Sequence, residues 1–181
     1  DGRPVAVPSQ DMVLGAYYLT MEKDGDLGEG KIFRDFNEAL MAYQDGVVSL
    51  HAKIKVRVTK QVGEHRISKI IDTTVGRMIF NEPIPQDLGF VDRTNSENQF
   101  DLEISFLVKK KQLGEIVDKC IRAHGTATTS EVLDNIKALG FKYSTKGATT
   151  VAVSDATIPP QKKQYLEEAE AAIEEIIDQF E

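Results

Sequence analysis

The sequence contains a single cysteine, Cys120, among its 181 residues, so the chain cannot form an internal disulfide. One isolated thiol is typical of a protein from a reducing cytosol. Cys120 also falls on the apolar stripe of a helix predicted over residues 109–124. That position favours a buried, inert thiol over a nucleophile, because a reactive thiol needs solvent access and a lowered pKa.

Long apolar runs and an excess of positive charge are also missing. No apolar run reaches the roughly 18 residues that a membrane-spanning helix needs. The first ten residues, DGRPVAVPSQ, are polar and lack an initiating methionine, so we expect no signal peptide and a segment processed or excised from something longer. The net charge of −7 argues against a free-standing nucleic-acid-binding protein, which usually carries a basic surface.

Signatures of catalysis and metal binding are absent as well. The three histidines, His51, His65 and His124, are dispersed, and no GxSxG, HExxH or Cys–His pattern occurs. The acidic, glycine-containing loop over residues 21–31 lacks the closing glutamate of a calcium loop, and Gly28 stands at a ligand position. We therefore predict no catalytic and no metal-binding residue, and a stand-alone enzyme is the least favoured class.

The segment PSQDMVLGAYYLT, residues 8–20, predicts a short, largely buried helix. Pro8 fits a helix start, and Ser9 or Asp11 can cap free backbone N–H groups. Gln10 and Asp11 then form the polar mouth of this helix. The simplest interpretation is a capped core helix, and the alternative is a helix whose mouth lines the path of a ligand.

The remaining pattern predicts an α+β fold, a small mixed or antiparallel sheet with packed helices, because helices and strands are segregated without regular βαβ alternation. Strand 50–59 alternates apolar residues with Lys53, Lys55 and Arg57, and its basic face is either solvated or contacts phosphate or an acidic partner. We expect helices over 35–44, 109–124 and 129–139, and the last two should end at Gly125 and Gly140. Extended segments are expected over 66–71 and 73–80.

Two further charges have alternative interpretations. Arg77 follows a Thr-Thr-Val-Gly sequence and can pair with a carboxylate of its own domain or bind outside it. Lys146 precedes Gly147 in a segment, residues 141–155, that is rich in hydroxyl groups and is expected to form a small-residue turn. One lysine on such a turn is a weak phosphate-binding signal.

The last segment predicts a coiled-coil helix. Apolar residues recur at intervals of three and four, a period of 3.5 that needs a partner helix. The chain therefore either forms a homodimeric scaffold through this helix or lacks the returning arm of a hairpin. The seam consists of Leu166, Ala169, Ile173, Ile176 and Phe180, and its acidic outer faces include Glu167, Glu170, Glu174 and Asp178.

Four stretches together resemble the largest subunit, β′, of bacterial DNA-directed RNA polymerases. They are DGRPVAVPSQDMVLGAYYLT at the start, GVVSLHAKIKVRVT at 46–59, DTTVGRMIFNEPIP at 72–85 and the segment 142–159. The resemblance covers essentially the whole chain. The NADFDGD motif that binds the catalytic metal in this family is not in the sequence, nor are the bridge helix and trigger loop.

The resemblance implies the pore and funnel region of β′, which borders the secondary channel, at residues 1–158. Residues 159–181 would be the first helix of the rim, where transcription factors that enter the channel dock. Gln10, Asp11 and Lys146 would line the path of the nucleotide. The implied parent enzyme is a cytoplasmic or plastid nucleotidyltransferase that uses Mg²⁺ and works with DNA, RNA, nucleoside triphosphates and the other polymerase subunits. This segment alone is expected to be inactive.

Overall fold

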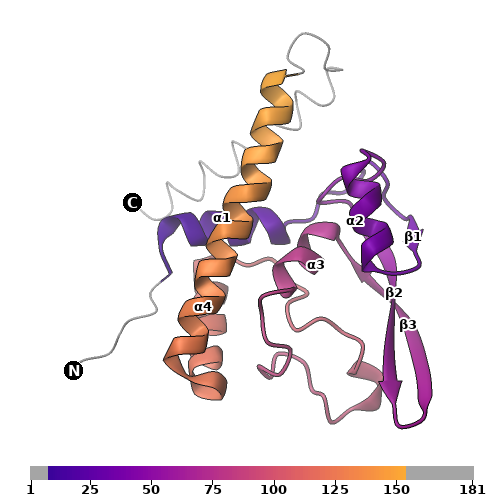
Figure 1. Ribbon diagram of the computed structural model, residues 1–181, viewed down its shortest axis with the longest axis vertical. Helices are drawn as coiled ribbons and strands as arrows, with labels where there is room; N and C mark the ends of the chain where they lie inside the picture. Colours follow the sequence, from indigo (N-terminus) through magenta and orange to yellow (C-terminus); the bar gives the residue numbers. More distant parts are fainter. Residues whose placement is uncertain (1–7, 154–181) are drawn as a thin grey trace.

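The computed structural model describes residues 8–153, and the side chains of residues 8–146. The described part is an α+β fold, as predicted, with a three-stranded mixed sheet and four α-helices. The sheet and α2 lie on one side, α1 and α4 lie on the other, and α3 lies between them (Figure 1). The core is continuous from α1 through α3 to the base of the sheet.

Helix α1, Gln10–Thr20, confirms the helix predicted from PSQDMVLGAYYLT. The Ser9 hydroxyl accepts a hydrogen bond from the backbone N–H of Met12, which satisfies one of the unpaired donors at the helix start. Val13, Ala16 and Leu19 are almost fully buried. The helix is thus fixed in the core, and only its amino end is polar and exposed.

The sheet has the order β1-β2-β3. Strand β1, Ile32–Phe33, pairs in parallel with β2, Ile54–Val62. The helix between them is α2, Phe36–Gln44, which is capped by Asp35 and confirms the helix predicted over 35–44. Strand β3, His65–Thr73, pairs antiparallel with β2 around a turn at Gly63, whose φ of 62° is the positive angle that tight hairpin turns need. Strand β2 begins four residues later than predicted, because residues 50 and 51 form a turn and the strand starts only at Ile54.

The prediction of an extended segment over residues 73–80 is wrong. After Thr73 the chain forms helix α3, Val75–Asn81, in which every residue is buried. The β-branched Thr-Thr-Val sequence suggested a strand, but the Thr74 hydroxyl accepts a hydrogen bond from the N–H of Arg77 at 3.0 Å and caps the helix. Gly76 lets the backbone carbonyl of Leu19 approach α3 closely.

The predicted arrangement over residues 109–155, two helices followed by a turn segment, is wrong in part. Helix α4, Lys110–Val153, is interrupted at Gly125, where φ is 86° and ψ is 174°, so Gly125 ends the first half as predicted. Thr129 donates a hydrogen bond to the Gly125 carbonyl within the second half, which therefore begins earlier than residue 129. Gly140 does not end this half, and residues 141–153 are helical rather than a turn.

Between α3 and α4 the chain is irregular, apart from the short 3₁₀ helix η1, Ser96–Asn98. The predicted coiled-coil helix, with its seam and acidic faces, lies outside the described residues. Within the described part, no helix has the length and apolar character needed to cross a membrane.

Candidate functional site

The amino end of α1 presents two exposed polar side chains, Gln10 and Asp11, in the first helical turn. The carboxylate of Asp11 is favourably placed there, because the amino end of a helix carries partial positive charge. Ser9 already caps the helix, so neither Gln10 nor Asp11 is needed for that bond. The predicted polar mouth is therefore present at the surface of the described structure.

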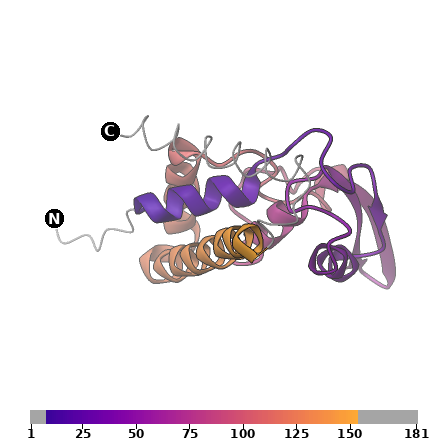
Figure 2. The same ribbon diagram turned by 90° about the horizontal axis from the view of Figure 1, so that it is seen from above.

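Helix α1 crosses the second half of α4 at two glycines (Figures 1 and 2). A Cβ atom added to Gly15 would lie 2.9 Å from the Cα of Gly140, and one added to Gly140 would lie 2.6 Å from the Cα of Gly15. Both distances are too short for real side chains, so only glycine permits this contact. The crossing joins α1, which carries Gln10 and Asp11, to α4, which carries Lys146.

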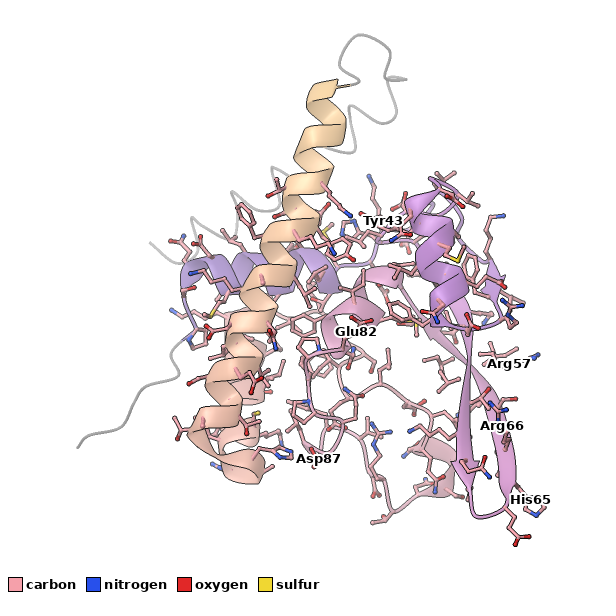
Figure 3. The ribbon with its side chains drawn as sticks, in the orientation of Figure 1. Tyr43, Arg57, His65, Arg66, Glu82 and Asp87 are labelled. Carbon is pink, nitrogen blue, oxygen red and sulfur yellow. The ribbon has the colours of Figure 1, made fainter. Side chains whose placement is uncertain are left out.

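Lys146 lies on a helix instead of the predicted glycine turn, because α4 continues through this segment. Its side chain is exposed, and its Nζ lies 5.5 Å from the centre of the Tyr143 ring. Tyr143 in turn faces Tyr43 of α2, with 6.0 Å between ring centres, and Figure 3 shows Tyr43 on the side of α2 that faces α4. Burial raises the pKa of both phenols, so both stay neutral. The pair is a contact between α4 and α2.

Arg77 pairs within its own domain, the first of the two predicted alternatives. Its guanidinium forms an ion pair with Glu22, and its Nε donates to the carbonyl of Thr20 at 2.8 Å. It also donates to the carbonyl of Ser105 at 3.2 Å. Burial lowers the pKa of Arg77, and the nearby Glu22 opposes that effect. Arg77 thus connects the end of α1 with the segment before α4.

His51 is a packed histidine. Its Nε2 lies 2.7 Å from the carbonyl oxygen of Tyr18, and its ring meets the Tyr18 ring edge-on. Burial lowers the pKa of His51. Burial, helped by the charges of Tyr43 and Asp26, raises the pKa of Tyr18 to about 12. These groups stabilise the loop after α1 and do not form acid–base machinery.

The basic face predicted for β2 is present and exposed. Lys53 forms an ion pair with Asp24, and Lys55 forms one with Asp72, so both lysines have carboxylate partners. The side chains of Arg57 on β2 and Arg66 on β3 form no ion pair or hydrogen bond within the described part of the chain. Figure 3 shows both residues on the hairpin. With Arg34 they line a shallow hollow of about 470 Å³ at the base of the hairpin.

The described residues do not fit a magnesium ion. Nowhere between residues 8 and 146 do three His, Cys, Asp or Glu side chains gather closely enough to hold a metal. We therefore derive no chemical step through a metal in this part of the chain. Cys120 is fully buried, which agrees with the predicted inert thiol.

Sequence reasoning missed a buried ion pair in the segment between α3 and α4. The Glu103 side chain has no exposed surface, and its carboxylate lies 3.1 Å from the guanidinium of Arg93. It also accepts a hydrogen bond from the backbone N–H of Phe90 at 2.5 Å. The signal available in the sequence was one acid within the apolar run LEISFLV, residues 102–108.

Comparison with known proteins gives consistent matches. Residues 1–156 match the family described as RNA polymerase Rpb1, domain 3. The chain is 58% identical over 176 residues to the DNA-directed RNA polymerase subunit beta' of Clostridium novyi (strain NT), covering 97% of this chain and 15% of that protein. It is 57% identical over 180 residues to the subunit of the same name from Acetivibrio thermocellus, covering 99% of this chain and 16% of that protein. It is also 57% identical over 180 residues to the subunit of that name from Thermoanaerobacter pseudethanolicus, covering 99% of this chain and 15% of that protein.

Proposed function

The chain belongs to the family of RNA polymerase Rpb1, domain 3, and on this premise we propose that it is a channel-forming segment of a DNA-directed RNA polymerase β′ subunit. The match to β′ subunits over 97–99% of the chain carries this proposal, and it confirms the resemblance seen in the sequence. The chain spans 15–16% of the length of these curated relatives. In this proposal the catalytic metal, Mg²⁺, and its ligands belong to other parts of the same subunit.

The proposed role of the described part is to border the secondary channel, through which nucleotides pass inward and the RNA 3′ end passes outward. Gln10 and Asp11 are exposed at the amino end of α1, a position from which side chains can line a path. Lys146 is an exposed cation on α4 and would attract triphosphate. Residues 1–158 would form the pore and funnel, and residues 159–181 the first rim helix.

The remaining parts of the proposal concern partners and location. The outer faces of the rim helix, with Glu167, Glu170, Glu174 and Asp178, would dock secondary-channel transcription factors. The other polymerase subunits, DNA and RNA would be partners through the assembled enzyme, which would act in the cytoplasm of a bacterium. The alternative, a homodimeric scaffold, depends on the seam at residues 166–180, outside the described residues, and no observation favours it.

The first experiment measures the size of the native protein. An antibody raised against this chain should detect, in the source cells, a band several-fold larger than 20.1 kDa that co-purifies with templated RNA synthesis. A native band at 20.1 kDa would overturn the proposal.

The second experiment tests the channel role in the assembled polymerase. Gln10→Ala combined with Asp11→Ala should change the KM for nucleoside triphosphates several-fold and leave kcat unchanged, because groups that only line a path do not act in the chemical step. Asp134→Ala combined with Asn135→Ala, an exposed acid and amide on α4, is the matched control. Equal KM values for both variants would refute a role of α1 in nucleotide passage.

A further inference from the structure

Strand β3 forms an open edge of the sheet. It is nine residues long, it contains no proline, and among residues 8–153 its only neighbour in the sheet is β2 (Figure 1). In an antiparallel pair, every second residue of each strand bonds to the partner and the others point their backbone groups away. Counted from the pair Val62 and His65 beside the turn, the outward-pointing residues of β3 are Arg66, Ser68, Ile70 and Asp72.

These outward backbone groups have no partner within the described part of the chain. No backbone or side-chain group there bonds to the N–H or C=O of Arg66, Ser68, Ile70 or Asp72 outside the β2–β3 ladder. The corresponding edge of β2 differs, because β1 covers its first part and Lys55 donates to the Lys31 carbonyl at 2.9 Å. Of the two edges of the hairpin, β3 therefore has the longer row of unpaired backbone N–H and C=O groups among the described residues.

The same hairpin exposes apolar surface. All ten residues from 61 to 70 are exposed, and among them Val62 is 40% exposed while Ile67 and Ile70 are each 44% exposed. An isolated two-stranded ribbon is marginally stable in water. Here Lys60 and Lys69 donate hydrogen bonds to the carbonyls of Gln99 and Glu97, and the outer edge of β3 remains open. Natural proteins protect free edges with prolines, bulges, very short strands or charged side chains. β3 has no proline and an unbroken register from residue 65 to 73, and its charged residues Arg66, Lys69 and Asp72 are the only one of these devices that it carries.

We infer that the outer edge of β3 binds an extended, acidic segment from another part of the same polymerase subunit, which adds a fourth strand to the sheet. This inference rests on the proposed function. Since this chain spans 15–16% of its relatives' length, most of such a subunit lies outside it. A segment of the same polypeptide binds without the concentration cost of a separate partner.

The chemistry of β3 specifies this segment. Arg66 and Ile70 lie on one face of the ribbon, with the uncompensated Arg57 beside Ile70 on β2. The added strand should therefore place a carboxylate opposite Arg66 and an aliphatic side chain opposite Ile70. A nucleic acid fits less well, because it cannot continue a backbone ladder and gains little from aliphatic side chains.

The experiment uses the full-length subunit in the assembled polymerase, with a photo-crosslinking benzoylphenylalanine at position 68. The expected crosslink joins position 68 to one acidic segment of the same subunit. The amides of Arg66, Ser68, Ile70 and Asp72 should exchange hydrogen at least roughly tenfold more slowly than the turn amides of Gly63 and Glu64. A crosslink to nucleic acid or to another subunit, or rapid exchange at these four amides, overturns the inference.

A pair of proline variants separates strand addition from general strain. Ser68→Pro removes an outward N–H of β3, so hydrogen exchange in the crosslinked segment should speed up. Thr59→Pro removes an outward N–H on the opposite edge of the hairpin, so it should leave hydrogen exchange in the crosslinked segment unchanged. Ser68→Ala keeps the N–H of residue 68 and should also leave that exchange unchanged. Equal effects of both prolines would contradict the inference. If the full-length subunit fails to assemble into a polymerase at all, the proposed function fails instead, so the two failures are distinguishable.

Discussion

Gly15 of α1 and Gly140 of α4 touch backbone to backbone, and the two helices meet where neither has a side chain. A Cβ on either glycine would lie less than 3 Å from the Cα of the other, at 2.9 Å and 2.6 Å. This contact explains why the second half of α4 continues through a glycine that resembled a terminator. Gly140 leaves the space that α1 needs at the crossing. The φ angle of Gly140 is not positive, so this glycine does not have the conformation of a helix terminator.

Gly15→Ala should destabilise the chain by about 1–3 kcal/mol, because the new methyl group must push apart two packed helices. The measurement is the free energy of unfolding from urea titration. Gly114→Ala is the matched control, since Gly114 is an exposed glycine of α4 with nothing within 4 Å of an added Cβ. The control should gain about 0.5–1 kcal/mol from better helix propensity. Stabilisation by both substitutions would show that the helices do not meet at Gly15.

Arg77→Lys should destabilise the chain by about 2–4 kcal/mol, although the charge is kept. A lysine cannot donate at once to Glu22, the Thr20 carbonyl and the Ser105 carbonyl, which all bond to the guanidinium of Arg77. The buried carbonyls would then lack donors. Thermal unfolding monitored by circular dichroism measures the loss.

The control for Arg77 is Arg122→Lys. Arg122 pairs with Asp118 one turn earlier on α4, and its side chain is 77% exposed. Exposed ion pairs contribute little, so this variant should stay within about 0.5 kcal/mol of the wild type. Equal losses from the two substitutions would mean that burial of Arg77 has no energetic importance.

The sequence was sufficient to predict elements whose signals are local. Ser9 caps α1 and Gly125 ends the first half of α4, and each of these roles depends on a few neighbouring residues. The α+β class, predicted from the segregation of helices and strands, is confirmed. For Arg77 the sequence left two alternatives open, and the structure shows an ion pair with Glu22 of the same domain.

The sequence failed where tertiary contacts override local preference. Residues 75–81 are helical because α3 is buried on every side, against α1 and the core, and β-branched residues then lose their preference for strands. Residues 141–153 are helical although small and hydroxyl residues suggested a turn. The open edge of β3 could not be predicted either, because neighbouring strands are a property of the assembled sheet.

Glu103→Gln should destabilise the chain by about 2–4 kcal/mol, because it removes the charge that the Arg93 guanidinium faces. Arg93 Nε is buried without a hydrogen-bond partner, and Nη1 already donates to the carbonyls of Asn98, Gln99 and Asp101, so Nη2 is the group that faces Glu103. Urea unfolding measures the loss. Glu115→Gln, an exposed glutamate on α4, is the control and should be neutral. A coupling energy near zero between Glu103→Gln and Arg93→Met would show that the ion pair between these two side chains does not stabilise the fold.

The stability of the chain should fall below about pH 6.5, in part because of His51. Burial lowers the pKa of His51 in the folded state, whereas in the unfolded chain the imidazole binds a proton at its ordinary pKa of 6.5. The unfolded state therefore binds more protons in the window between the lowered value and 6.5, and stability rises with pH there and is complete above it.

His51→Gln tests this pH dependence. Glutamine keeps a donor for the Tyr18 carbonyl, which His51 Nε2 contacts at 2.7 Å, but it cannot be protonated. The difference between the urea midpoints at about pH 5 and about pH 7.5 should therefore be smaller in the variant than in the wild type. His65→Gln is the control, because His65 is exposed at the hairpin tip (Figure 3) and should leave this difference unchanged. If both variants keep the wild-type difference, carboxylates and not His51 account for the loss of stability in acid.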